Sequence, residues 1–196
     1  LFYNLSYYLS NPYDIFKVWE GWMSFHGWLI GVILAVLLFS KRYKKSFFSV
    51  MDPLAIIVPV AIGFWRIGNY INQELLWFTP YSGPFAIVKN GVSYFPSTLL
   101  EMFLEWILLF LIMLIGAQRL WFFLEENKQK KMRTGQLSAL FLLWYGSLRL
   151  FSEQFRLPDT HIGYLFHTEW LTIGMIYTLP LIIIGGILLW TTQKKY

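Results

Sequence analysis

Cysteine is absent from this chain of 196 residues. Its absence excludes disulfides, thiolate metal ligands and a cysteine nucleophile belonging to the protein itself. Charged residues are also scarce, at 14%, whereas hydrophobic residues reach 57% and aromatic residues 20%. A soluble domain of this length carries more charge, so the composition indicates a polytopic membrane protein. Any thiol in its chemistry must therefore arrive with a substrate.

The hydrophobic residues gather in runs close to the length of about 20 residues that a bilayer core requires. They predict an all-α polytopic membrane helical bundle with about five transmembrane spans. We expect a single membrane domain over residues 1–196, because no polar segment is long enough to bury a core of its own. A break in the second span, at Pro53, Pro59 or Gly63, would suit a binding site. The predicted spans are 25–40, 53–71, 97–118, 136–152 and 170–190.

The net charge of +5 does not indicate nucleic-acid binding, because the basic residues cluster after alternate spans. Five alternating spans place 11 of the 16 Lys and Arg residues on one side of the membrane. The positive-inside rule makes this side cytoplasmic and puts the C-terminus there. The segments 1–24, 72–96 and 153–169 then face outward. Within them, the stretch 76–96 is rich in proline and glycine and is predicted to be an outer loop over a cavity.

Two arginines, Arg66 and Arg149, fall inside predicted spans. An arginine at membrane depth is energetically costly, so it indicates a functional site that faces a protected cavity. On a helix, Asn69 and Gln73 share a face with Arg66, and Glu74 lies one position further. A guanidinium presents a planar fork of donors that matches phosphate oxygens. This cluster predicts a site for an anionic ligand.

Arg149 has polar neighbours at similar spacing. Glu153 and Arg156 lie four and seven positions after it, and Tyr145 lies one turn before it. Because residues four apart meet on a helix, Glu153 can orient Arg149 and leave part of its fork free. Arg156 also suits the outer boundary, where a long side chain reaches the interface.

The histidines offer one candidate for proton transfer. His26 opens the first predicted span, and its side chain titrates near neutral pH. A histidine in such a place is more often a hydrogen-bonded structural residue. His161 and His167 are predicted to be surface residues of an outer loop, and the three are too scattered to indicate a zinc site. No feature calls for a metal, a nucleotide or another cofactor.

Five motifs follow one another along the chain. They are Gly21-Trp22-Met23-Ser24-Phe25-His26-Gly27, then Arg66-Ile67-Gly68-Asn69-Tyr70-Ile71-Asn72-Gln73-Glu74-Leu75, then Pro96-Ser97 with Leu99 and Glu101, then Leu140-Phe141-Leu142 with Tyr145-Gly146 and Arg149, and last Glu153-Gln154-Phe155-Arg156 with Pro158-Asp159. In this order they resemble the prolipoprotein diacylglyceryl transferase family, bacterial inner-membrane enzymes that lipidate lipoprotein precursors. The resemblance covers essentially the whole chain.

The resemblance implies a reaction. A diacylglyceryl group moves from phosphatidylglycerol to the thiol of a lipobox cysteine in a prolipoprotein, which forms a thioether and releases glycerol phosphate. It implies an active site on the periplasmic side of the inner membrane, and a seven-span fold whose first two spans have no counterpart in these residues. The implied partners are phosphatidylglycerol, the lipobox peptide and the lipid bilayer.

The resemblance also marks the site residues. The catalytic set is His26, Arg66, Asn69, Glu74 and Arg149. The substrate-binding set is Gly21, Ser24, Gly27, Asn72, Ser97, Glu101, Tyr145, Glu153 and Arg156. We expect Arg66 and Arg149 to hold the phosphate and stabilise charge on the leaving glycerol phosphate. His26 is the first choice to accept the thiol proton, although an arginine-lowered thiol pKa would make a dedicated base unnecessary.

Some residues depart from the family motifs. Trp22 and Trp28 replace glycines, Phe95 stands where a histidine precedes Pro-Ser, and Thr98 stands where a glutamine follows. Bulky residues in place of glycine would narrow a lipid or peptide path. An altered substrate preference or a catalytically degenerate relative is therefore an alternative.

Two further alternatives come from the charges alone. An anionic-solute transporter also places arginines at membrane depth, but no internal repeat is visible in the sequence. A membrane scaffold would neutralise its charges internally, with Arg66 paired to Glu74 and Arg149 to Glu153. In the enzyme, the five catalytic residues converge on one cavity open to lipid and to the periplasm.

Overall fold

The computed structural model describes residues 10, 13, 25–73, 76, 80–126, 134–156, 163–165, 168 and 170–194, with side chains for all of these except 25–29, 119–126, 193 and 194. These residues are mostly helical. The chain divides into two compact units, Leu1–Val50 and Met51–Tyr196. The prediction of one membrane domain over residues 1–196 stays a prediction.

The first unit contains helix α2, Phe25–Arg42, which ends in Lys41 and Arg42. Two cations in the last turn of a helix complement the negative end of its dipole. Ser46 then caps the next helix, because its Oγ accepts a hydrogen bond from Ser49 N at 3.3 Å. That helix is α3, Phe47–Ile71, and most of it belongs to the second unit.

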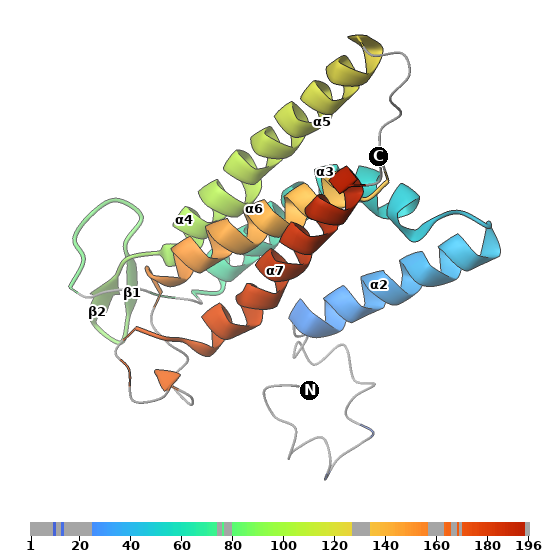
Figure 1. Ribbon diagram of the computed structural model, residues 1–196. Helices are drawn as coiled ribbons and strands as arrows, with labels where there is room; N and C mark the ends of the chain where they lie inside the picture. The colour runs from blue at the N-terminus through green and yellow to red at the C-terminus, as the bar shows by residue number, and fades with distance from the viewer. Residues whose placement is uncertain are drawn as a thin grey trace. The chain divides into compact units, whose positions relative to one another are not determined.

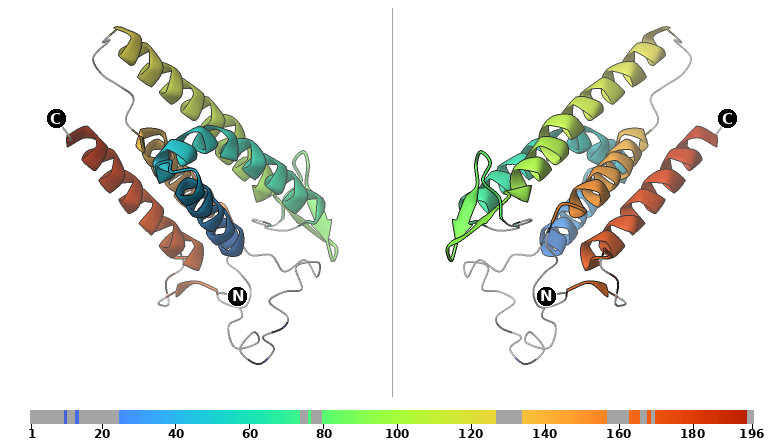
Figure 2. Two further views of the ribbon diagram at one scale, coloured as in Figure 1. Left: turned by 90° about the vertical axis from the view of Figure 1, so that its right-hand side faces the viewer. Right: turned by 90° about the vertical axis from the view of Figure 1, so that its left-hand side faces the viewer.

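The second unit is a set of long helices (Figure 1). After α3 come α4, Ser97–Met102, the π-helical segment η3, Phe103–Leu108, and α5, Leu109–Glu126, which follow one another directly. Helix α6, Gln136–Glu153, lies beside α7, Ile173–Lys194, as Figure 1 and the right-hand view of Figure 2 show. A Cβ on Gly185 of α7 would lie 2.9 Å from the backbone nitrogen of Leu143 in α6, so these two helices pack at close range.

The π-helical segment brings Trp106 against α3. A Cβ built on Gly63 would lie 2.2 Å from the Trp106 ring, so the indole occupies the space that a larger residue would fill. The neighbouring Phe64 ring lies 5.6 Å from the Trp106 ring, centroid to centroid. A π-helical turn adds a residue to the turn and rotates the side chains on it, and such turns often mark functional sites. Here the turn carries Glu105.

A short antiparallel hairpin precedes α4 (Figure 1). Strand β1, Ile87–Lys89, pairs with β2, Val92–Tyr94, with Ile87 opposite Tyr94. Asn90 and Gly91 form the turn with φ of 53° and 74°, the positive values that a two-residue hairpin turn requires. Tyr81 N donates to Ser93 O at 3.1 Å and extends this pairing. The segment 76–96, predicted to be a loop, therefore includes a small sheet.

The helices match the predicted spans in order. Three described helices are long and apolar enough to cross a membrane, namely Phe47–Ile71, Ser97–Gln118 and Ile173–Thr192. The membrane helical character is therefore confirmed, and the count of five spans stays a prediction. Helix α3 is continuous through Pro53 and Pro59, so it has no break. Membrane helices accommodate proline where neighbouring groups satisfy the freed backbone carbonyl.

Candidate active site

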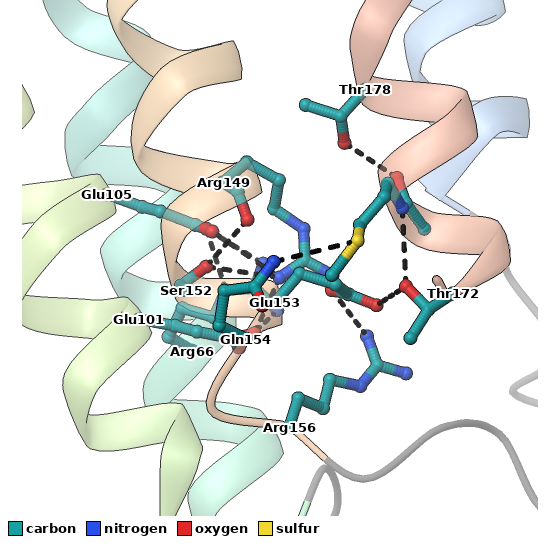
Figure 3. Close-up of polar contacts among 12 residues, drawn as sticks. Arg66, Glu101, Glu105, Arg149, Ser152, Glu153, Gln154, Arg156, Thr172 and Thr178 are labelled. Carbon is teal, nitrogen blue, oxygen red and sulfur yellow. Dashed lines mark hydrogen bonds and ion pairs between the residues drawn. The ribbon is translucent and has the colours of Figure 1, made fainter. Parts of the chain in front are cut away.

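Six charged side chains of the second unit form one buried network (Figure 3). Three are cationic and three anionic, so their formal charges sum to zero. They come from α3, from α4 and η3, and from α6 and the turn after it. The six are Arg66, Glu101, Glu105, Arg149, Glu153 and Arg156.

Arg66 of α3 directs its guanidinium at the two glutamates of the facing helix. Its Nε and NH2 groups donate to Glu105 Oε2 at 2.9 and 2.7 Å. Its NH1 lies 3.0 Å from Glu101 Oε2. The Arg66 side chain is 9% exposed and both glutamates are fully buried. A guanidinium paired on two sides in this way satisfies its charge without water.

Arg149 of α6 completes the bridge. Its NH1 donates to Glu101 Oε1 at 2.6 Å, and its NH2 lies 2.6 Å from Glu153 Oε2. The same NH1 is 3.4 Å from Ser152 Oγ and 3.8 Å from Glu105 Oε1. Glu101 thus binds Arg66 through one oxygen and Arg149 through the other, and it holds the two guanidinium groups close together. The pairing of Arg149 with Glu153, expected from their spacing, is present.

Glu153 is held by the start of α7. Thr172 Oγ donates to Glu153 Oε1 at 2.9 Å and accepts a hydrogen bond from Met175 N at 3.3 Å, so one hydroxyl caps α7 and orients the carboxylate. The positive end of the α7 dipole also favours an anion here. Arg156 NH1 lies 3.8 Å from Glu153 Oε2 (Figure 3).

Gly174→Ala is expected to disturb this arrangement. A Cβ at residue 174 would lie 2.4 Å from Glu153 Oε1, which forces the carboxylate away from Thr172 and Arg149. We expect the rate of the transfer reaction implied by the family resemblance to fall, by up to about 100-fold if the Glu153 carboxylate is displaced by about 1 Å. Gly186→Ala on the same helix is the matched control, because its Cβ would lie 4.0 Å from the nearest side chain, Leu143. Equal activity of the two purified variants would contradict this role of Gly174.

The network explains how Arg66 can be buried in an apolar helix and linked to Arg149. A buried cation is tolerated when carboxylates pair with it and hydrogen bonds satisfy the remaining donors. The same arginines present the donors that phosphate oxygens match best. An anionic ligand that enters this network can exchange with a glutamate oxygen, because carboxylate and phosphate use the same guanidinium contacts.

The network contains five of the predicted site residues, namely Arg66, Glu101, Arg149, Glu153 and Arg156. Tyr145 is buried one turn before Arg149, and its ring stacks on Phe141 at 5.5 Å.

The other predicted site residues fall into three groups. Asn69 is half-buried one turn after Arg66, Ser97 is fully buried at the start of α4, and Asn72 is exposed in the turn that follows α3. Gly21, Ser24 and Glu74 lie outside the described residues. His26 and Gly27 are described only as backbone in the first turn of α2. Convergence of His26 and Glu74 on the arginines stays a prediction.

Sequence reasoning missed Glu105 and Thr172. Glu105 had a visible signal, because it is an acidic residue inside an apolar span and lies four positions after Glu101. Thr172 had only the weak signal of a threonine before a helix. Among the described residues, no group of three or more His, Cys, Asp or Glu side chains could hold a metal ion.

Comparisons with known proteins identify the family of this chain. The family model described as prolipoprotein diacylglyceryl transferase matches residues 1–191. The chain is 43% identical over 205 residues to the phosphatidylglycerol–prolipoprotein diacylglyceryl transferase of Pseudomonas fluorescens, across 100% of this chain and 69% of the relative. It is 43% identical to the same enzyme of Pseudomonas aeruginosa, across 99% and 70%, and 41% identical to that of Pseudomonas syringae, across 100% and 70%.

Proposed function

The chain belongs to the prolipoprotein diacylglyceryl transferase family, and on this premise we propose that it transfers a diacylglyceryl group from phosphatidylglycerol to the lipobox cysteine of a prolipoprotein. The carrying observation is that two arginines, the buried Arg66 and the half-buried Arg149, are joined through Glu101 in a chain that has no thiol of its own. The arginines can bind the phosphate of the lipid, and the substrate cysteine supplies the thiol.

The reaction is a substitution at the carbon of the diacylglyceryl unit that is bonded to the phosphate oxygen. The cysteine sulfur forms the new C–S bond, the C–O bond to the phosphate breaks, and its electrons leave on the phosphate oxygen of glycerol phosphate. Arg66 and Arg149 stabilise this developing charge, since preorganised cations in a water-poor site lower the barrier most. The thiol proton must be lost, because the thiolate is the nucleophile.

The phosphate reaches the arginines by exchange with carboxylates. Arg149 NH1 is shared between Glu101 at 2.6 Å and Ser152 at 3.4 Å, so a phosphate oxygen can replace one of these contacts while NH2 keeps Glu153. Glu153 then acts as the group that orients Arg149. Arg156, 3.8 Å from Glu153 Oε2, lies where a second headgroup oxygen can be contacted.

His26 is the proposed acceptor of the thiol proton, with Asn69 and Glu74 as further catalytic residues. Its support is the position of His26 in the family motif and the titration range of histidine. If His26→Gln retains full transfer at neutral pH, then His26 is not the base.

The proposed placement is the bacterial inner membrane with five spans in this chain, the C-terminus in the cytoplasm and the active site toward the periplasm. Its support is the distribution of Lys and Arg along the sequence. Because the chain has no cysteine, single cysteines introduced at residues 44 and 89 report sidedness without background. A membrane-impermeant maleimide should label only the second in intact cells.

Incubation of the purified full chain with phosphatidylglycerol and a lipobox peptide tests the reaction directly. Transfer adds the mass of a diacylglyceryl group to the peptide. Phosphatidylcholine in place of phosphatidylglycerol and Arg149→Ala are the controls. Internal neutralisation of charge is also what an inactive scaffold would show, so a folded protein that produces no mass shift would favour that alternative.

A further inference from the structure

Another buried carboxylate, Asp52, lies far along α3 from the arginine network. Asp52 is 3% exposed, and three donors at the start of α6 converge on it. Gly135 N donates to Asp52 Oδ2 at 2.6 Å, and Ser138 donates to Oδ1 through its backbone N at 2.9 Å and its Oγ at 2.6 Å. We refer to these three hydrogen bonds as the Asp52 clamp.

The clamp replaces a cap that α6 lacks. Gly135 stands at the N-cap with φ of 101° and no side chain, so no capping side chain comes from α6 itself. The first turn of any helix leaves backbone N–H groups without an internal partner, and such groups are costly away from water. Asp52 satisfies Ser138 N and places its negative charge at the positive end of the α6 dipole.

The clamp connects the two helices that carry the arginines. Asp52 and Arg66 are fourteen residues apart on α3, or about 21 Å, and Ser138 and Arg149 are eleven residues apart on α6, or about 16 Å. At the far end, Glu101 links Arg66 to Arg149. Helices α3 and α6 are therefore joined at two levels, directly at Asp52 and through α4 at the arginines.

We propose that Asp52 is a positioning residue for the diacylglyceryl transfer and that the clamp fixes the axial position of Arg149 relative to Arg66. A shift of α6 along its axis by a single residue moves Arg149 by about 1.5 Å. Misplacement by about 1 Å is enough to lower a rate about 100-fold. This role rests on the proposed function, and it extends the active site to a residue four helical turns away.

The carboxylate form of Asp52 is essential to the clamp, since all three partners are donors. An ionised carboxylate accepts at both oxygens, whereas an amide turns one NH2 toward a donor. Asp52→Asn is therefore expected to break the contact to Gly135 or the contacts to Ser138 with little change in volume. Ser49→Ala, in the first turn of the same helix, removes a local bond to Ser46 and leaves the clamp intact, so it is the matched control.

Two measurements on the full chain test the proposal. The first is kcat for transfer to a lipobox peptide in phosphatidylglycerol vesicles, which should fall about 100-fold in Asp52→Asn and stay unchanged in Ser49→Ala. The second is the distance distribution between spin labels on cysteines introduced at Ile71 and Phe151, both exposed positions near the arginines. It should broaden in Asp52→Asn.

A covalent bridge separates positioning from other roles of the carboxylate. In Asp52→Cys with Ser138→Cys, dibromobimane joins the two introduced thiols by stable thioethers that a thiol substrate does not open. Bridging should restore most of the transfer lost in the unbridged protein. The bridged variant also tests the proposal if Asp52→Asn fails to fold, since the bridge is made on the membrane-embedded protein.

The outcomes distinguish the proposals. Normal kcat in Asp52→Asn, lost transfer with an unchanged label distance, or a bridged protein that stays inactive would each overturn the positioning role. A broadened distance in Asp52→Asn together with no transfer by the unaltered protein would overturn the proposed function and leave the clamp as a link between helices.

Discussion

Arg149→Lys is expected to lower kcat for diacylglyceryl transfer about 100- to 1,000-fold, the range seen when one preorganised donor to a developing anion is removed. Arg149 uses two nitrogens on opposite sides, NH1 toward Glu101 and NH2 toward Glu153, each at 2.6 Å. A lysine keeps the charge but offers a single nitrogen, which cannot reach both carboxylates and a phosphate. Geometry is lost although the charge is kept.

Arg42→Lys is the control for the loss of the guanidinium geometry. Arg42 is exposed in the last turn of α2, so this variant has the same substitution outside the network. Both variants should be purified and shown to have equal thermal stability, and kcat and KM are then measured by peptide mass shift. The prediction fails if Arg149→Lys transfers as fast as Arg42→Lys.

Much of the fold follows from local features of the sequence. The apolar runs predict the helices because a helix alone satisfies every backbone group within one segment of a membrane. The hairpin also had a local signal, since Asn90-Gly91 favours a two-residue turn, but the surrounding proline and glycine residues suggested an irregular loop. The π-helical segment around Glu105 had no such signal, and its Trp106 packs on Gly63, a residue far away in the sequence.

The site shows the same division between local and distant contacts. The Arg149–Glu153 pair is four residues apart, so helical periodicity predicts it. The partners of Arg66 are 35 and 39 residues away, and the Asp52 clamp joins residues 83 and 86 apart. A single sequence contains no measure of such distances. It predicts that a buried arginine needs an anion, and the tertiary packing decides which glutamate supplies it.

Glu105→Ala is expected to destabilise the protein by about 3 to 5 kcal/mol, the usual effect of removing one partner of a buried ion pair. Glu105 Oε2 accepts from both Nε and NH2 of Arg66 at 2.9 and 2.7 Å, and Glu105 is fully buried. Alanine leaves the Arg66 cation with Glu101 alone, and Glu101 already serves Arg149. The network then has a surplus positive charge among buried side chains.

The double variant Arg66→Met with Glu105→Met tests whether charge imbalance is the cause. Replacing both partners of a buried pair with apolar residues is often neutral, so thermal unfolding in detergent should return close to that of the unaltered protein. Transfer should stay absent, because the phosphate has lost Arg66. Equal destabilisation in Glu105→Ala and in the double variant would instead assign the effect to lost packing around Trp106. The opposite result, a stable and inactive double variant, would separate the two tasks of the network, in which the glutamates keep the arginines folded and the arginines act on the lipid.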